Sequence, residues 1–261
     1  MYKFIFILVI IGLLINCSDK DPIDPDPPNR VLLVMKEEGF DTLEVERGID
    51  AEPNPNSAVN GIHLEWYDPT DKYRIEYYNL YRSGDVEGRL NYKMVGNTEN
   101  LLNPLDTVYI DTTQGLSNNH RYWYYVTAVN EDGDESEPSD TVHYTLIEKA
   151  TELSINNYNP VLTDSNITFM WSVDSDDIPV GYYLRVEQNI SESFHPLAFF
   201  REISVNEVDY NPPQTYEVSL EEFKVPVMED QNYRWRIDCV GTDLYSGAES
   251  DWAEFTVNME Q

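Results

Sequence analysis

Hydrophobic and polar residues alternate in short segments over most of the chain after Asn60. Two of the clearest are "GIHLEW", residues 61–66, and "RYWYYVTAVN", residues 121–130. A period of two is typical of a strand with one face in a core. Gly, Pro, Asn and Asp separate these segments, and no helical period is sustained over several turns. The pattern therefore predicts an all-β chain of antiparallel sandwiches.

The same order of segments occurs twice. "NITFMW", residues 166–171, repeats the pattern of residues 61–66, and "NYRWRIDCVG", residues 232–241, repeats that of residues 121–130. In this alignment Cys239 takes the place of Ala128. It is therefore expected to be a small buried core residue, with a reactive thiol as the alternative.

One strand of the first repeat should bring a charge to its inner face. "YNLYR" places Tyr78, Leu80 and Arg82 on the same side. The guanidinium of Arg82 is expected to extend to solvent at the edge of the sheet. Residues 31–56 are less regular, and the apolar stretch "VLLVMKEEG" suggests an early edge strand of the first sandwich.

These residues resemble the fibronectin type III module, which has a tryptophan on its second strand and the pattern Y-x-Y-x-V-x-A-V on its sixth. A leucine six residues before the first of these tyrosines marks the tyrosine corner, in which the phenol binds the backbone of the preceding loop. In the first repeat the matching residues are Trp66, Leu116, Tyr122, Tyr124, Val126, Ala128 and Val129. The second repeat is more divergent and matches through Trp171 and Tyr233. The resemblance implies one module over residues 31–147, with its core match in 57–146, and a second over 148–261.

The N-terminal segment indicates export. Lys3 precedes an apolar run, residues 4–15, that is about as long as a signal-peptide core and too short to cross a bilayer. Residues 14–17, "LINC", resemble the lipobox of bacterial lipoproteins, which implies a signal peptide over 1–16 and acyl chains on Cys17. An ordinary cleaved signal peptide that leaves Cys17 free is the alternative.

The residues that follow Cys17 are acidic and rich in proline. "SDKD", residues 18–21, looks like the signal that sends some Gram-negative lipoproteins to the outer face of the outer membrane. Because "DPIDPDPPNR" can bury little apolar surface and its prolines favour extended backbone, residues 17–30 are expected to form a stalk. The expected location is the cell envelope, with a lipid anchor in the outer membrane and exposure at the cell surface.

Charge and cysteine content limit the possible partners. The formal net charge is −31, which opposes bulk electrostatic binding to nucleic acid. With only two cysteines, one of them the expected lipidation site, no internal disulfide is expected.

No pattern for catalysis or for a cofactor stands out. The four histidines, His63, His120, His143 and His195, lie on separate expected strands or loops, without metal-ligand spacing. Nucleophile-elbow and phosphate-loop motifs are absent. The sequence therefore predicts a protein that is not an enzyme and has no cofactor. Clustered carboxylates in "NEDGDESE", residues 130–137, and "DSDDIP", residues 174–179, leave calcium as an alternative to plain acidic loops.

An excess of aromatic residues suggests a binding face. If Tyr122 and Tyr124 face the core, alternation sends Trp123 and Tyr125 outward, and the neighbouring strand sends out Tyr77 and Tyr81. Such a face marks an interaction site unless residues 31–47 or the second module cover it. The favoured function is a non-enzymatic lipoprotein whose modules serve as spacer and as adhesion or protein-interaction units. The alternative is a glycan-binding lipoprotein of a nutrient-uptake system.

Overall fold

The computed structural model describes residues 27–36, 47–84, 89–155, 166–173, 179–209, 213–224, 227 and 230–257, except for the side chain at position 73. The expected signal peptide, the lipidation site Cys17 and stalk residues 17–26 lie outside the described residues. Among those described, no helix is long and apolar enough to span a membrane.

Two β-sandwiches make up the described chain, which confirms the all-β prediction. The strands of the first module are β1 (Asp50–Glu52), β2 (Gly61–Glu65), β3 (Tyr77–Gly84), β4 (Lys93–Asn97), β5 (Val108–Asp111), β6 (His120–Val129) and β7 (Val142–Leu146). Those of the second are β8 (Thr151–Ile155), β9 (Asn166–Ser172), β10 (Gly181–Gln188), β11 (Leu197–Ser204), β12 (Gln214–Ser219), β13 (Asn232–Val240), β14 (Ser246–Glu249) and β15 (Ala253–Thr256). Short 3₁₀ turns, η2 (Lys72–Arg74), η3 (Val205–Glu207) and η4 (Leu220–Glu222), connect some of the strands.

The two modules have the same topology. In the first, the sheet β1-β2-β5 packs against β4-β3-β6-β7, and in the second β8-β9-β12 packs against β11-β10-β13 with β14 and β15. Three strands facing four in this order is the fibronectin type III-like arrangement of a sandwich. The last strand of the second module is divided, because β14 and β15 both pair with the same side of β13.

The inward-facing residues of each strand build one core per module. Trp66 on β2 meets Tyr78 edge-on, with ring centroids 5.1 Å apart, and Trp171 on β9 meets Tyr182 at 5.3 Å. The internal repeat is therefore preserved as three-dimensional packing. Cys239, opposite Tyr182 as Ala128 is opposite Tyr78, is buried, and burial raises the pKa of its thiol to about 12.

Side-chain hydroxyls form hydrogen bonds with backbone groups that have no partner strand. The Tyr122 hydroxyl donates to the Gly115 carbonyl and accepts from the Ser117 N–H, both at 2.9 Å, which forms a tyrosine corner before β6. Ser139 accepts from the Val126 N–H at 2.9 Å, and Ser250 accepts from the Ile237 N–H at 3.0 Å. The two serine hydroxyls replace strand carbonyls that the irregular last strand of each module does not supply.

Arg82 does not extend to solvent, contrary to the expectation from its sequence position. Its guanidinium crosses to the opposite sheet and contacts Asp111 at 2.6 Å, and Tyr124 donates to the same carboxylate at 2.9 Å. The Asp111 side chain is fully buried. A buried carboxylate needs a paired cation, and Arg82 is that cation for Asp111. The alternation of residues along β3 could not indicate this pair, because Asp111 is remote in sequence.

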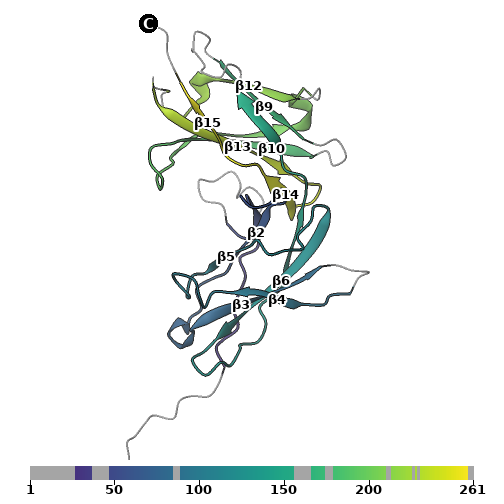
Figure 1. The fold of residues 1–261 in the computed structure, drawn as a ribbon, viewed down its shortest axis with the longest axis vertical. Coiled ribbons are helices and arrows are strands. Elements are labelled where there is room, and N and C mark those ends of the chain that lie inside the picture. Colours follow the sequence, from purple (N-terminus) through teal and green to yellow (C-terminus); the bar gives the residue numbers. More distant parts are fainter. Residues whose placement is uncertain are drawn as a thin grey trace, which may run out of the picture.

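The modules are joined through one continuous sheet. β14 of the second module pairs in parallel with β7 of the first, and this pairing produces the order β11-β10-β13-β14-β7-β6-β3-β4. Figure 1 shows the sandwiches stacked along the long axis, with β14 reaching toward the first module. Only residues 147–150 lie between β7 and β8. Because a short connection and a shared sheet act together, the modules meet in one defined orientation.

The segment before β1, expected to be an early edge strand, forms an isolated bridge beside the end of β2 in its described part and no regular strand. Leu33 forms an antiparallel bridge with Trp66, and the Val34 N–H donates to the Glu65 carbonyl at 2.8 Å. The described part of this segment, residues 27–36, therefore extends the β1-β2-β5 sheet and does not lie over the opposite sheet.

Candidate functional site

A group of aromatic rings lies on the outer side of the β4-β3-β6-β7 sheet. Tyr81 on β3 is directly opposite Tyr125 on β6, and Trp123 is opposite His143 on β7. Tyr92, just before β4, also contacts the ring of Tyr125. We call these residues the aromatic face: Tyr81, Tyr92, Trp123, Tyr125 and His143.

The rings of the aromatic face pack against one another. Tyr81 and Tyr125 stack with centroids 4.6 Å apart and an interplanar angle of 14°, and Tyr92 leans on Tyr125 at 4.8 Å. Each ring is half-buried. Stacking keeps part of the flat surfaces of Tyr81 and Tyr125 against each other.

Glu135 fixes one end of the stack. Its carboxylate accepts hydrogen bonds from the hydroxyls of Tyr81, at 3.0 Å, and Thr127, at 2.7 Å, and from the amide of Asn79, at 3.0 Å. Burial, and then the nearby carboxylate of Glu135, raise the pKa of Tyr81 to about 12. The hydrogen bond from the Tyr81 hydroxyl to Glu135 fixes the position of the ring.

Only part of the sequence-predicted face comes together. Tyr81, Trp123 and Tyr125 belong to the group, but Tyr77 lies opposite Val129, beyond the row formed by Asn79 and Thr127. Tyr77 is half-buried and outward-facing.

Sequence reasoning missed two members of the aromatic face, Tyr92 and His143, and also the exposed Met94 beside it. The alternation of "VHYTL", residues 142–146, would have placed His143 outward if it had been followed on that strand. Tyr92 lies just before β4 and Met94 is its second residue. The pairing of β3 with β4 has a register shift, so alternation alone could not place these two side chains.

The second module covers one end of the aromatic face. Tyr245, in the turn before β14, contacts His143 with ring centroids 4.9 Å apart, and Asp243 pairs with Arg121 at 3.1 Å. Burial, followed by the charge of Arg121, lowers the pKa of His143. The end formed by Tyr81, Tyr92 and Tyr125 has no such cover from described residues of the second module, and Met94 beside it is 55% exposed.

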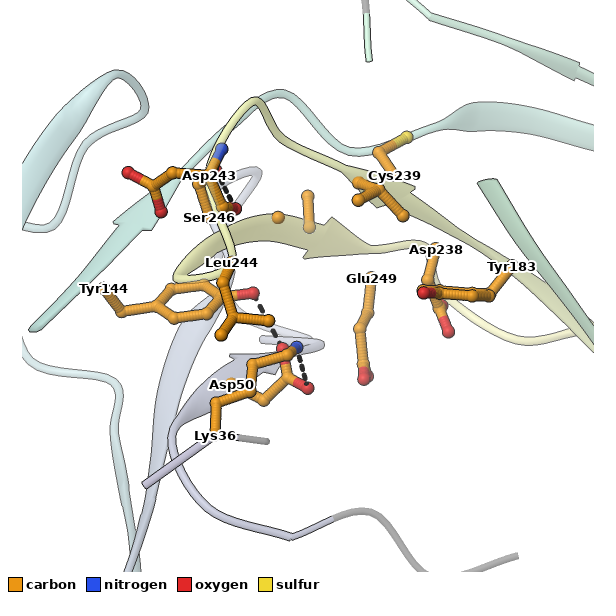
Figure 2. A pocket seen from close by; sticks show the side chains of 13 residues that line it. Lys36, Asp50, Tyr144, Tyr183, Asp238, Cys239, Asp243, Leu244, Ser246 and Glu249 are labelled. Carbon is orange, nitrogen blue, oxygen red and sulfur yellow. Dashed lines mark hydrogen bonds and ion pairs between the residues drawn. The ribbon is translucent and has the colours of Figure 1, made fainter. Parts of the chain in front are cut away.

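A small cavity of about 70 Å³ lies where the modules meet (Figure 2). On the side of the first module, the Tyr144 hydroxyl donates to Asp50 at 2.7 Å, and Lys36 pairs with the same carboxylate at 2.6 Å. The second module contributes Asp238, Cys239 and Glu249 to the lining. Tyr144 also lies below Gly247, where a Cβ atom would stand 2.8 Å from its hydroxyl. The cavity is large enough to hold a few water molecules.

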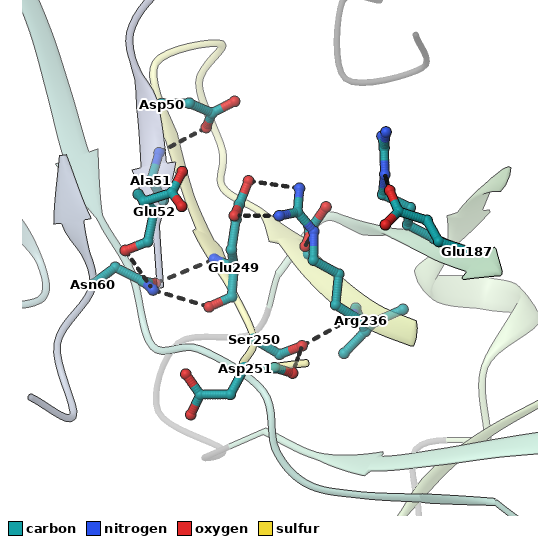
Figure 3. Close-up of polar contacts among 12 residues, drawn as sticks. Asp50, Ala51, Glu52, Asn60, Glu187, Arg236, Glu249, Ser250 and Asp251 are labelled. Atoms are coloured by element: carbon teal, nitrogen blue, oxygen red, sulfur yellow. Dashed lines mark hydrogen bonds and ion pairs between the residues drawn. The ribbon is translucent and has the colours of Figure 1, made fainter. Parts of the chain in front are cut away.

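Asn60 links the modules beside this cavity (Figure 3). Its amide nitrogen donates to the carbonyls of Glu249, at 2.9 Å, and Glu52, at 3.2 Å, while its amide oxygen accepts from the Glu249 N–H at 3.2 Å. The Glu249 side chain forms a bidentate pair with Arg236 at 2.7 and 2.8 Å. Asn60, Arg236 and Glu249 are all buried. The side-chain amide of Asn60 therefore bonds the main chain of Glu249 in the way that a residue of a neighbouring strand would, and this contact fixes the junction.

The remaining candidate residues show no shared site in the described part of the chain. No group of three or more His, Cys, Asp or Glu side chains is placed to hold a metal ion there. In the loop 130–137, Asn130 accepts from the N–H groups of Asp132 and Asp134, and Glu135 is occupied by the aromatic face. Residues 174–178 of the other acidic loop lie outside the described residues.

Comparisons with known proteins identify no family for this chain. No family model matches the chain, and no curated protein matches it. A comparison with solved structures finds 318 matching chains. One is the crystal structure of chicken CNTN1 FN1-FN3 domains, with 14% sequence identity, coverage of 89% of this chain and 68% of that chain, and a TM-score of 0.37. The fold assignment therefore rests on the strand topology of the chain itself.

Proposed function

We propose that this chain is a lipid-anchored, non-enzymatic cell-surface protein. Its two fibronectin type III-like modules would hold a protein-binding face at a fixed height and orientation. The observation that carries the proposal is the arrangement of the aromatic face, in which stacked tyrosine rings lie beside the exposed Met94 at the end that the second module leaves open. Tyrosine and methionine side chains suit the apolar and polar groups of a protein surface.

The junction supports the spacer part of this proposal. A shared sheet and the buried Asn60 contact leave little freedom between the modules. A rigid pair of modules presents the binding face in one orientation relative to the rest of the described chain.

The glycan alternative finds less support at this face. A sugar ring packs its C–H groups on the flat surface of an aromatic ring. Tyr81 and Tyr125 already cover part of each other's flat surfaces at a centroid distance of 4.6 Å. A neutral-glycan platform would therefore need these rings to separate first.

Photo-crosslinking in cells tests the protein-binding proposal. We would introduce p-benzoylphenylalanine in place of Met94 and, as the matched control, in place of Tyr77, which lies on the same side of the sheet but outside the aromatic face. We expect a discrete protein adduct from the Met94 position that the Tyr125→Ala variant diminishes, and no such adduct from the Tyr77 position. The same adduct from both positions, or none from position 94, would refute a protein-binding role for this face.

The anchor is tested separately. Metabolic labelling with a fatty-acid probe should tag the wild-type chain and should not tag the Cys17→Ser variant. Protease treatment of intact cells should then remove the tagged chain if it is exposed at the surface. Absence of labelling would favour the alternative of an ordinary signal peptide, and equal labelling of the Cys17→Ser variant would rule out this site.

A further inference from the structure

Two consecutive leucines are exposed at the end of the first module that lies farther from the second. Leu101 is 44% exposed and Leu102 is fully exposed, both in the loop that joins β4 to β5. We call residues 98–106 the leucine loop. Neither leucine belongs to the core or to the aromatic face. Two adjacent leucines in water gain free energy when they enter an apolar medium, so this loop is suited to a contact outside the chain.

Buried hydrogen bonds hold the leucine loop in place. Thr98 is fully buried, its N–H donates to the Tyr78 carbonyl and its hydroxyl accepts from the Tyr78 N–H, both at 2.9 Å. The same hydroxyl donates to the Pro104 carbonyl at 2.6 Å, and Leu105 packs against the core. The base of the loop is therefore closed, and the two exposed leucines stand on a fixed support.

The N-terminal segment enters the first module at the same end. The Asn29 N–H donates to Asp71 at 2.8 Å, in the connection that leads to β3, and the leucine loop contacts the start of β3 through Tyr78. The opposite end of this sheet, where His120 of β6 pairs with Leu146 of β7, is the end that meets β14. Because β6 has ten residues, the two ends are about 30 Å apart.

The length of chain before this segment limits how far the leucine loop can be from the expected acylation site. Residues 18–26 separate Cys17 from Pro27, where the described chain begins. A segment of this length spans at most about 36 Å when fully extended. Acyl chains on Cys17 would therefore keep this end of the module close to a lipid surface. A second contact beside an anchor forms at a high effective concentration, so two leucines are enough to make it.

We propose that Leu101 and Leu102 insert into the lipid surface beside the acyl anchor and so fix which end of the first module faces it. The inference rests on the lipid anchor proposed above and adds a second point of contact to it. The loop itself carries Glu99 and Asp106, and the net charge of the chain is −31. These charges oppose anionic headgroups, so the surface that fits the loop is one of zwitterionic lipid.

Fluorescence quenching by brominated lipid tests this contact. The chain from Cys17 onward would be coupled through that thiol to phosphatidylcholine vesicles that contain a maleimide lipid, with Cys17→Ser as the coupling control. For Leu102→Trp, we expect the emission gained over the wild type to be at least twofold lower in dibrominated than in unbrominated phosphatidylcholine. The matched control is Phe194→Trp, an exposed position between β10 and β11 at the far end of the second module, where the gained emission should be the same in both lipids.

The coupling supplies the anchor chemically, so the result does not depend on whether cells acylate Cys17, which the labelling experiment tests by itself. Unquenched Leu102→Trp emission, or equal quenching of both variants, would overturn the inference. Stronger quenching after phosphatidylglycerol is added would also overturn it, because that order indicates an electrostatic contact. If the uncoupled chain sediments as a dimer that Leu101→Ser/Leu102→Ser converts to a monomer, the leucines contact a second copy and the lipid contact is refuted. All these variants replace exposed side chains, so their urea midpoints should equal that of the wild type.

Discussion

Replacing Asn60 by alanine should release the junction between the modules. The substitution removes one hydrogen bond to Glu52 and two to the main chain of Glu249, whose own exposure is 3%. A buried main-chain group without a partner costs about 1–3 kcal/mol. For the N–H and carbonyl of Glu249 together, the expected loss in the free energy of unfolding is therefore about 2–6 kcal/mol.

Two measurements together check this value. Urea denaturation gives the change in unfolding free energy, with Asn56→Ala, at an exposed position in the same loop, as the control. Hydrogen exchange should show that the Glu249 amide loses protection in the Asn60→Ala variant. The Ile237 amide, which binds Ser250 within the second module, should keep its protection. A variant as stable as the Asn56→Ala control, with Glu249 still protected, would refute the assignment of Asn60 as the link between modules.

Three further outcomes follow from the packing. Gly247→Ala should lower the unfolding free energy by about 1–3 kcal/mol, because its Cβ would meet the Tyr144 hydroxyl at 2.8 Å and the Cys239 carbonyl at 3.0 Å; an unchanged urea midpoint would contradict this. Tyr122→Phe should cost about 1–3 kcal/mol in the same assay, since the Gly115 carbonyl and the Ser117 N–H both lose their partner, and a neutral effect would mean that water replaces the phenol. Burial raises the pKa values of the Tyr78 phenol and the Cys239 thiol from 10.0 and 9.0 to about 12, so the unfolded chain loses these protons first. The contribution of these two groups to stability should therefore be constant below about pH 9, and the unfolding free energy should fall as the pH rises from there toward 12. In the Cys17→Ser background a thiol reagent at pH 8 should label Cys239 only after unfolding, and labelling of the folded chain would contradict its burial.

The alternation of side chains determined the fold class and most of the core from sequence alone. A strand has a strict period of two, so "GIHLEW" and "RYWYYVTAVN" fixed which residues face inward, and the repeated order of segments fixed the number of sandwiches. The alignment of Cys239 with Ala128 correctly predicted that Cys239 is buried, because the two residues occupy equivalent core positions of the two modules.

Tertiary structure decided everything that depends on contacts remote in sequence. The partner of Arg82 is Asp111 on the opposite sheet, and the group that binds Asn60 is 189 residues away, so no local pattern could indicate either. Alternation placed Tyr81 and Tyr125 outward, but whether their rings would stack, and which end of the face Tyr245 would cover, depended on strand register and on the docking of the second module. Local periodicity specifies the face of a strand on which a side chain lies, whereas the packing of separate strands and modules specifies what that side chain meets.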